Sequence, residues 1–440
     1  MKCEELLQAL QREHRLAPEE WAFLLAHWQD CADAAMALAR QAAVARFGTK
    51  IFFRGIIEFT SHCRNDCLYC GLRRSNQAAD RYRLTQEEIL ACCAAGYALD
   101  FRTFVLQGGE DGYWTDDRLV ALVAAIRRHF PDCAITLSIG ERSRASYQRL
   151  FDAGADRYLL RHETACPAHY RRLHPPEMRW ENRLRCLRDL LEIGYQTGCG
   201  MMVGTPGQTV QTLVQDMQLL QQLRPQMVGI GPFLPHRDTP LRDAPPGDPR
   251  LTCYLLALTR LLLPDALLPA TTALGTAEVD GRKQGVLAGC NVVMPNLSPQ
   301  AERKKYMLYD NKAGTDLSAA AGVQLLRAQM AEIGYTVITG RGDFSPGQEE
   351  MKWRLQRTIK GKPNYPLSLF KSFVILLSSG SMAQKNTITR IIGGRLNYSG
   401  ILTLSTATGL PFLRIITRRT LRAVSNITNT WLAIWRLSAS

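Results

Sequence analysis

Acidic residues are missing from the C-terminal part of this 440-residue chain, because residues 351–440 contain no Asp and no Glu. The same stretch holds 14 of the 54 Lys and Arg residues, and the other 40 are balanced by the 40 acidic residues of residues 1–350. The net charge of +14 therefore comes entirely from the C-terminal stretch. Strongly basic proteins often bind nucleic acids or anionic membranes, but the neutral body argues against both partners for residues 1–350.

The basic stretch also lacks clear hydrophobic periodicity and the mixed charge of ordinary surface helices. We interpret residues 345–440 as a basic C-terminal extension that is disordered or unrelated to the rest of the chain. Two alternatives stay open, namely a disordered basic arm that binds nucleic acid and a small appended module. Nothing in this stretch resembles a catalytic motif.

Long hydrophobic runs are absent as well. The longest uncharged apolar run, SFVILLSSGSMA at residues 372–383, is too short and too polar to span a bilayer. The N-terminal sequence MKCEELLQALQREH is charged, unlike a signal segment, and the 13 cysteines are an odd number. We therefore expect a cytoplasmic protein with reduced cysteines, whose 46% hydrophobic content suffices for a core without disulfides or metal.

Residues 1–48 are expected to form a helical N-terminal segment. Apolar residues recur at helical spacing from about residue 4 to residue 45, as at Leu6, Leu7 and Leu10. Pro18 is expected to begin the second helix of this segment, since proline is tolerated in the first helical turn.

Residues 49–344 alternate short apolar runs with longer amphipathic stretches. The eight expected strands are IFFRGIIEF (51–59), TFVLQ (103–107), AITLSIG (134–140), RYLLRHE (157–163), TGCGMMVG (197–204), MVGIGPF (227–233), LLPATTA (267–273) and NVVMPN (291–296). Strands that alternate with helices are parallel, and eight such units close into a (β/α)8 TIM-type barrel. An open doubly wound sheet is the competing arrangement.

Polar residues gather where these strands end, which is where barrel enzymes carry their chemistry. The clusters are Cys63 to Cys70 after the first strand, QGGED (107–111) after the second, Ser138 at the end of the third, RHE (161–163) at the end of the fourth, and Thr271 and Thr272 at the end of the seventh.

Three cysteines in the first of these loops, Cys63, Cys67 and Cys70, are spaced C-x3-C-x2-C. Structural zinc sites prefer four protein ligands, and no second cysteine pair is visible downstream. A disulfide would leave one thiol over, and a chance cluster of buried cysteines is a further alternative. The position of the loop favours an iron–sulfur cubane held by three thiolates, which leaves one iron free to bind something other than protein.

The cysteine motif, with Tyr69 before its last cysteine, resembles that of the radical S-adenosylmethionine (SAM) superfamily. The resemblance implies one 4Fe-4S cluster whose free iron binds the amino and carboxylate groups of SAM. An electron from the cluster then cleaves SAM to methionine and a 5′-deoxyadenosyl radical. The element VLQGGED (105–111) resembles the superfamily's Gly-Gly-Glu element, in which Gly108 and Gly109 allow close approach of the backbone.

The SAM contacts that this resemblance implies lie at the ends of the second, third and fourth strands and on the helix that follows. They are Gln107, Gly108, Glu110, Thr136, Ser138, Arg161, Glu163 and Arg183. Arg161 and Glu163 are expected on the same face because side chains alternate along a strand, and the alternative for them is a surface ion pair. Arg183 would reach the SAM carboxylate from its helix, although helix arginines commonly face solvent.

A narrower resemblance rests on YLLRHET (158–164), GPFLPHRDTPL (231–241) and LPATTALGT (268–276). Together they are similar to the HydE family of FeFe-hydrogenase maturases, relatives of biotin synthase and methylornithine synthase, over about residues 1–344. The resemblance implies that the adenosyl radical acts on a cysteine-bound Fe(CO)2(CN) precursor of the hydrogenase di-iron subsite. Expected partners are HydG-type and HydF-type maturases and an electron donor such as a ferredoxin or flavodoxin.

The same resemblance implies a substrate cavity inside the barrel that takes an anionic iron species. Its residues are Arg157, Thr271, Thr272, Met294 and Tyr306, and a cation with hydroxyl donors would complement such a ligand. The alternatives are β-branched strand filler for the threonines and an ordinary lid aromatic for Tyr306.

One departure from the family is a missing accessory site. Some members carry three further cysteines just after the barrel, and the corresponding stretch here, YDNKAGTDLSAAAGVQLL (309–326), has none. We therefore expect a single cluster. Two rivals remain: methylornithine synthase or biotin synthase-like sulfur chemistry on the same barrel, and a non-catalytic protein that carries metal or binds nucleic acid through the basic extension.

Overall fold

The computed structural model describes residues 2–347 and 350, which belong to one compact unit, Met1–Met351. Of the predicted C-terminal extension, 345–440, only residues 345–347 and 350 are described. The expectation about the remainder of that extension lies outside the described residues.

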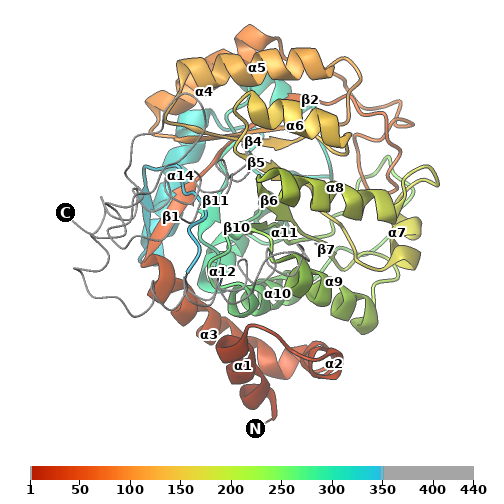
Figure 1. The fold of residues 1–440 in the computed structure, drawn as a ribbon, viewed down its shortest axis with the longest axis vertical. Coiled ribbons are helices and arrows are strands. Elements are labelled where there is room, and N and C mark those ends of the chain that lie inside the picture. Colours follow the sequence, from red (N-terminus) through yellow and green to blue (C-terminus); the bar gives the residue numbers. More distant parts are fainter. Residues whose placement is uncertain (1, 348–349, 351–440) are drawn as a thin grey trace, which may run out of the picture. The chain divides into compact units, whose positions relative to one another are not determined.

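Three helices, α1 (Lys2–Glu13), α2 (Pro18–Ala26) and α3 (Trp28–Phe47), form the N-terminal part (Figure 1). Pro18 begins α2 as expected, because its missing N–H would have no helical partner in the first turn. Helix α3 packs along α10 (Pro249–Leu262), and the hydroxyl of Tyr254 on α10 donates to the carbonyl of Leu24, 3.0 Å away. The packing of α10 against α3 contributes to the complete burial of residues 252–262 of α10.

One disulfide joins the N-terminal helices, between Cys3 of α1 and Cys31 of α3, whose Cα atoms are 5.8 Å apart. This pairing corrects the expectation that every cysteine is a free thiol, which rested on composition and could not anticipate the crossing of two helices. Seven other cysteines of the described residues are free and buried: Cys92, Cys93, Cys133, Cys186, Cys199, Cys253 and Cys290.

The described strands form parallel sheets. Six strands pair in the order β2-β3-β4-β5-β6-β8, four in the order β10-β11-β1-β12, and β7 pairs with β9. Their bounds are β1 (Lys50–Phe53), β2 (Gly55–Thr60), β3 (Thr103–Gly108), β4 (Ala134–Ser138), β5 (Arg157–Leu159), β6 (Gln196–Cys199), β7 (Met202–Val203), β8 (Met227–Val228), β9 (Gly231–Pro232), β10 (Pro269–Ala270), β11 (Val292–Val293) and β12 (Thr336–Ile338).

Two isolated parallel bridges join these sheets. Met227 of β8 is bridged to Leu267, just before β10, and Ile56 of β2 is bridged to Asn296, just after β11. The amide of Leu297 donates to the carbonyl of Ile56 over 2.7 Å. The sheet order follows the chain order expected of a TIM-type barrel, and the parallel α/β class is confirmed.

Two expected strands, 197–204 and 227–233, are divided in the structure into β6 and β7 and into β8 and β9. At the first expected strand the structure differs in two further respects. The first expected strand is divided at Arg54 into β1 and β2, which pair in different sheets. Strand β12, parallel to β1, was not expected at all. Both of these differences concern β1, which pairs with β11 on one side and β12 on the other, while β2 pairs with β3.

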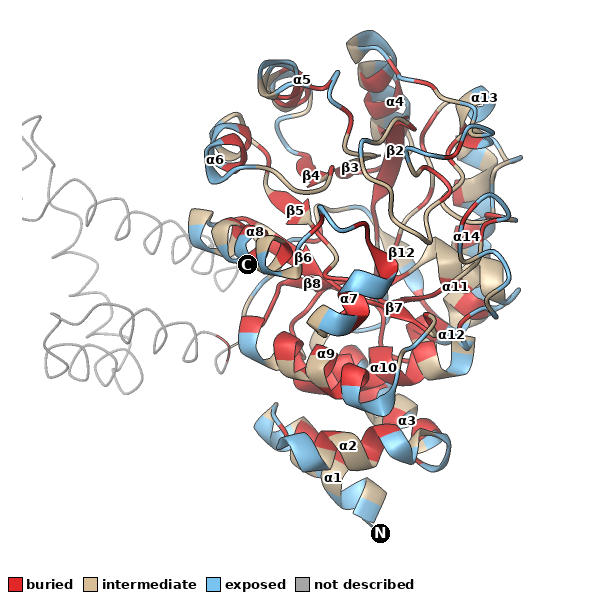
Figure 2. Ribbon diagram, turned by 90° about the vertical axis from the view of Figure 1, so that its right-hand side faces the viewer, coloured by how far each residue is buried: buried red, intermediate tan, exposed pale blue. Residues whose placement is uncertain are grey.

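The helices surround the buried strands and turn their exposed faces outward (Figure 2). Their bounds are α4 (Gln86–Ala98), α5 (Asp116–His129), α6 (Arg144–Asp152), α7 (Pro167–Leu173), α8 (Trp180–Ile193), α9 (Val210–Leu223), α11 (Thr272–Ala277), α12 (Gly281–Leu287), α13 (Gln300–Arg303) and α14 (Ala319–Glu332). A capping box between Thr85 and Glu88 begins α4. Within the described residues, no helix has both the length and the apolar character needed to cross a membrane.

Candidate active site

The three-cysteine loop follows β2 and is fixed by side chains that the motif itself does not reveal. Asp66 accepts two hydrogen bonds from Arg73, each 2.8 Å long, and two more from Ser75. Arg81 donates to the carbonyls of Ser61 and Leu72 at 2.6 and 2.9 Å. These contacts hold both ends of the loop against the neighbouring backbone.

The thiols of this loop lie in a buried environment and influence one another. Burial raises the pKa of Cys63, and burial together with Cys63 raises the pKa of Cys70 to about 12. The pKa of Cys67 is raised well above its usual value by burial and then by Cys70 and Cys63. The thiols therefore stay protonated near neutral pH until a metal cation displaces their protons.

Two glycines at the end of β3 bring this strand against the cysteine loop. A Cβ on Gly109 would lie 2.2 Å from the carbonyl oxygen of His62 and 2.7 Å from Cβ of Cys63. A Cβ on Gly108 would lie 2.7 Å from Cγ2 of Thr60. The close approach expected from the Gly-Gly pair is therefore an approach to the backbone of the cysteine loop itself.

A cavity of about 310 Å³ opens beside this loop at the carboxyl ends of the strands. It brings together most of the residues expected from the sequence. Those that line it are Cys63, Cys70, Gln107, Gly108, Glu110, Ser138, Arg161, Glu163, Arg183, Thr271, Thr272, Met294 and Tyr306.

A network of buried charges forms one wall of the cavity. Nη2 of Arg161 lies 2.9 Å from Oε2 of Glu163, and Arg183 donates from Nε to Glu141 over 2.5 Å and from Nη1 to the carbonyl of Arg161. The side chain of Arg183 is only 8% exposed, so this helix arginine does not face solvent. Oε2 of Glu163 is buried and, among the described residues, has no well-aligned hydrogen-bond donor.

The two groups of residues expected to bind SAM and substrate meet inside the cavity. Nε2 of Gln107 lies 3.5 Å from the hydroxyl of Tyr306. Thr271 caps α11, and its hydroxyl accepts from the amide of Leu274. One of the two threonine hydroxyls is therefore already engaged by the backbone.

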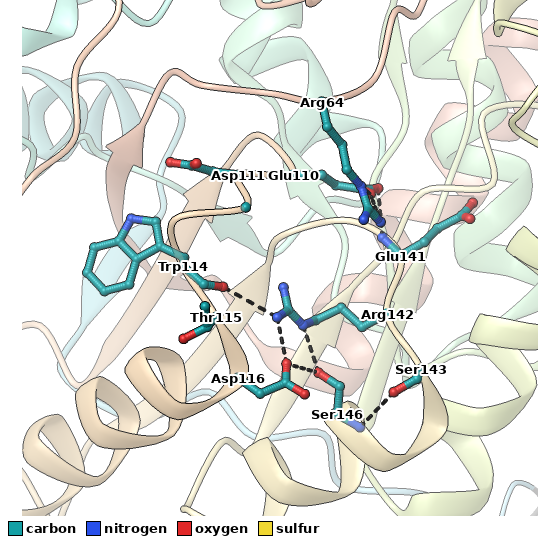
Figure 3. A pocket seen from close by; sticks show the side chains of 11 residues that line it. Arg64, Glu110, Asp111, Trp114, Thr115, Asp116, Glu141, Arg142, Ser143 and Ser146 are labelled. Atoms are coloured by element: carbon teal, nitrogen blue, oxygen red, sulfur yellow. Dashed lines mark hydrogen bonds and ion pairs between the residues drawn. The ribbon is translucent and has the colours of Figure 1, made fainter.

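Glu110 separates the central cavity from a second, polar pocket of about 240 Å³ (Figure 3). Its carboxylate accepts from Arg64 over 2.9 Å and from the amide of Glu141 over 2.8 Å. On the far side of the pocket Arg142 is paired with Asp116, which also accepts from Ser146 (Figure 3). Glu110 is thus committed to holding the cysteine loop to the turn after β4.

The cavity wall also contains an ion pair that was not predicted from the sequence. Nζ of Lys312 lies 2.5 Å from Oε1 of Glu58 and also donates to the carbonyl of Tyr306, while Asn296 donates to Oε2 of Glu58. The side chains of Lys312 and Glu58 are 5% and 3% exposed. Glu58 could have been noticed as the one acid inside the apolar run GIIEF, whereas no pattern marks Lys312.

Two predicted site residues and one cluster ligand do not line the cavity. Arg157 is the first residue of β5 and bonds the carbonyl of Arg341 and the carboxylate of Asp343, each over 2.7 Å. It lies four residues before Arg161, about 13 Å away along an extended chain, and so at the opposite end of the strands. This corrects its assignment to the cavity.

Thr136 lies in the middle of β4, buried, with no hydrogen-bond partner for its hydroxyl in the described part of the chain. The predicted cluster ligand Cys67 points toward Met178, and the sulfur atoms of these two residues lie 3.7 Å apart. No group of three or more His, Cys, Asp and Glu side chains in residues 2–347 is gathered as a metal site. If all three thiols hold one cluster, the side chain of Cys67 turns toward Cys63 and Cys70 when it binds.

Comparison with known families places this site in a class. The model of the radical SAM superfamily matches residues 57–220, which run from β2 and the cysteine loop to α9. The parallel α/β fold, the three-cysteine loop and this match define the class as an enzyme of the radical SAM superfamily.

Individual relatives narrow the class. The FeFe hydrogenase maturase subunit HydE of Thermotoga maritima is 49% identical over 265 residues, which cover 60% of this chain and 75% of that protein. The 3-methylornithine synthase of Methanosarcina acetivorans is 28% identical over 275 residues, covering 62% and 77%. The chain belongs to the HydE family within the radical SAM superfamily.

Solved structures support the fold. Methylornithine synthase (PylB) superposes with a TM-score of 0.66 and 23% identity, covering 76% of this chain and 97% of that one. The maturase HydG superposes with a TM-score of 0.65 and 18% identity, covering 90% and 94%. At these identities the similarity concerns the fold alone.

The cofactors of this class are a 4Fe-4S cluster and SAM. The residues present fit them in chemical type. Thiols are the usual ligands of iron–sulfur clusters, and Oε2 of Glu163 is a buried acceptor that an ammonium or hydroxyl group of SAM would satisfy.

Proposed function

We propose that this chain is a maturase that takes part in assembling the di-iron subsite of FeFe hydrogenase. The observation that carries the proposal is the 49% identity to the maturase subunit HydE, over 75% of that protein. The cavity beside the cysteine loop supports it, because the cavity has room for a ligand between the SAM end and the threonines after β10.

In this proposal Cys63, Cys67 and Cys70 hold the cluster. When bound, the cluster and SAM supply a 5′-deoxyadenosyl radical through one-electron reduction of SAM, with methionine as the other product. The chain's own residues bind and orient. Arg183 faces the SAM carboxylate, and Glu163 accepts from a hydroxyl or ammonium group, because both side chains are buried and charged in the wall of the cavity.

The remaining SAM contacts fall into two kinds. Gln107, Gly108, Ser138 and Arg161 line the cavity and are proposed to contact SAM directly. Glu110 is proposed to hold the cysteine loop in position, because its oxygens already accept from Arg64 and from the amide of Glu141. Thr136 is buried in β4 and does not line the cavity, so it is not included among the direct contacts.

The substrate end of the cavity is proposed to hold a cysteine-bound Fe(CO)2(CN) complex. Thr272, Met294 and Tyr306 line this end, with Lys312 as the nearby cation. A buried ammonium group and hydroxyl donors complement an anionic ligand. Arg157 is no longer included, since it is engaged at the other end of the strands.

The proposed partners follow from this role. A HydG-type maturase would supply the iron complex, a HydF-type maturase would receive the product, and a ferredoxin or flavodoxin would deliver the electron. Such chemistry requires a reducing compartment, so we propose a cytoplasmic location.

Anaerobically reconstituted protein tests the proposal. The protein is added, with SAM and reductant, to a maturation mixture that contains HydG-type and HydF-type maturases and apo-hydrogenase but no HydE. Recovery of hydrogenase activity is expected, and Cys63→Ser should abolish it. Cleavage of SAM without recovery of hydrogenase, together with formation of methylornithine, would contradict the proposal and favour the methylornithine synthase alternative.

A further inference from the structure

The backbone at Glu163 is unusual and needs support from its surroundings. Its φ angle is +64°, in the left-handed region that non-glycine residues rarely adopt. Such a conformation is strained and persists only where neighbouring contacts enforce it. Glu163 is also the residue whose buried Oε2 has no well-aligned donor among the described residues.

Two main-chain hydrogen bonds hold Glu163 beside the next strand. Its amide donates to the carbonyl of Gly200 over 3.0 Å, and its carbonyl accepts from the amide of Met202 over 3.3 Å. Gly200 packs directly against the backbone of Gly229, because a Cβ at Gly200 would lie 1.9 Å from the carbonyl oxygen of Gly229. The position of Glu163 therefore depends on the position of Gly200.

A buried histidine and aspartate fix Gly200 and both sides of Glu163. The amide of Gly200 lies 3.3 Å from Nδ1 of His162, and Nε2 of His162 lies 3.2 Å from Oδ1 of Asp216 on α9. The same oxygen accepts from the amide of Ala165 over 2.5 Å. The residues before and after Glu163 are thus tied to one carboxylate, and the side chains of His162 and Asp216 are 1% and 0% exposed.

Neither His162 nor Asp216 lines the cavity, so neither contacts a ligand there. We propose that His162 and Asp216 are positioning residues, which hold Glu163 in its left-handed conformation so that its carboxylate points into the cavity and contacts SAM. The inference rests on the proposed contact between Glu163 and SAM. In this arrangement Nδ1 of His162 faces the amide of Gly200, and Nε2 lies within ion-pair distance of Asp216 without a well-aligned hydrogen bond among the described residues.

The test compares SAM affinity in single and double variants of the full-length, cluster-loaded protein. Asp216→Asn keeps the shape but removes the charged acceptor, and His162→Phe removes both ring nitrogens. Each should weaken SAM binding on the order of tenfold or more, as loss of a charge-assisted hydrogen bond does. Either change should add nothing further in the Glu163→Ala background, because the positioned carboxylate is then absent.

The control is His169→Phe, which removes a buried ring that contacts Thr164 and Thr205 but not Gly200. It should lower stability without changing SAM affinity. A second readout needs no SAM: in Asp216→Asn the amide of Glu163 should exchange with solvent faster, whereas the amide of Leu160, bonded to the carbonyl of Gly198, should not.

The outcomes separate the two proposals. If Asp216→Asn and His162→Phe bind SAM as the unaltered protein does, or if their penalty persists in full beside Glu163→Ala, the positioning role is wrong and the SAM contact stands. If Glu163→Ala alone leaves SAM affinity unchanged, the contact proposed for Glu163 is wrong, and the inference falls with it. If Asp216→Asn does not fold, His162→Phe carries the comparison.

Discussion

Oδ1 of Asp343 lies 2.7 Å from Nη2 of Arg157, whose side chain is completely buried at the amino ends of the strands. Arg157 also donates to the hydroxyl of Thr103 and the carbonyl of Arg341. Its neighbour Arg54 is buried as well and bonds the carbonyl of Gly342. The segment of residues 341–343 thus supplies acceptors to two buried cations that the strands cannot satisfy themselves.

Asp343→Asn should therefore destabilise the protein. Breaking a buried ion pair commonly costs about 3 to 5 kcal/mol, but the side chain of Asp343 is 38% exposed, so we expect about 1 to 2 kcal/mol after solvent screening. Denaturant unfolding measures the change. Asp117→Asn is the control, since Asp117 pairs with Arg149 on the surface and should change stability little. An equal loss in both variants would contradict the expectation.

The stability that Asp343 provides should depend on pH. Burial alone would raise the pKa of Asp343, but Arg157 and Arg341 outweigh it and lower this pKa well below the usual range. A carboxyl group with a lowered pKa in the folded state stabilises fully above its unfolded pKa of about 4, and the stabilisation is lost as the pH falls further. The difference between the unaltered protein and Asp343→Asn should thus be constant near neutrality and shrink below about pH 4.

Lys312→Met should destabilise the protein strongly, because it leaves the carboxylate of Glu58 buried without its cation. The expected loss is about 3 to 5 kcal/mol. The double variant Glu58→Gln with Lys312→Met removes both charges and should recover much of that loss. Thermal unfolding of Lys312→Met, Glu58→Gln and the double variant measures this coupling. Additive losses of stability would show that the two residues are not coupled.

Gly109→Ala should disturb the cysteine loop, because its Cβ would meet the carbonyl oxygen of His62 at 2.2 Å. The backbone cannot move aside as a flexible side chain can, so we expect reduced iron content after reconstitution. Gly112→Ala is the matched control, since a Cβ there has no described atom within 4 Å. Full iron loading of Gly109→Ala would indicate that the loop has more freedom than its contacts suggest.

Cys63→Ser, Cys67→Ser and Cys70→Ser should each abolish cleavage of SAM, because each removes a proposed cluster ligand. Cys92→Ser is the control, since Cys92 is a buried core thiol of α4. The 4Fe-4S absorbance and the release of 5′-deoxyadenosine are measured together. Retained cleavage in Cys67→Ser would leave only the two cysteines that already line the cavity as ligands.

Truncation after Met351 should leave SAM cleavage intact, since the proposed ligands and contacts all precede this point. A truncation after Phe344 is less suitable, because the amide of Gly347 donates to Asp265 over 2.7 Å and the carbonyl of Ser345 accepts from Arg46. Loss of activity on truncation after Met351 would make the basic extension functional.

Much of the fold follows from local pattern. Alternating apolar runs and amphipathic stretches predict parallel strands in chain order, and Pro18 marks the start of α2. The bend at Arg54 and the addition of β12 could not be predicted, because both depend on which distant segments reach β1. The pairing of Cys3 with Cys31 likewise depends on how α1 crosses α3.

Some residues of the candidate site could likewise be predicted from the sequence, and others could not. Residues at or shortly beyond the end of a strand, such as Ser138 and Glu163, were predicted because the ends of parallel strands meet at one edge. Arg157 was wrongly placed in the cavity, because a family resemblance does not show at which end of a strand a residue lies. Lys312 and Asp216 were missed because their roles arise only when a loop and a helix distant in sequence reach the strands.

A hydrogen bond and an ion pair hold the segment that carries Tyr306, Leu308 and Lys312. The carbonyl of Leu308 accepts from the amide of Gly71 in the cysteine loop over 2.9 Å, while Lys312 is anchored to Glu58 on β2. All three side chains line the cavity. The same segment thus forms part of the cavity wall and contacts the cysteine loop, so a substitution that displaces it should disturb both the cavity and the loop.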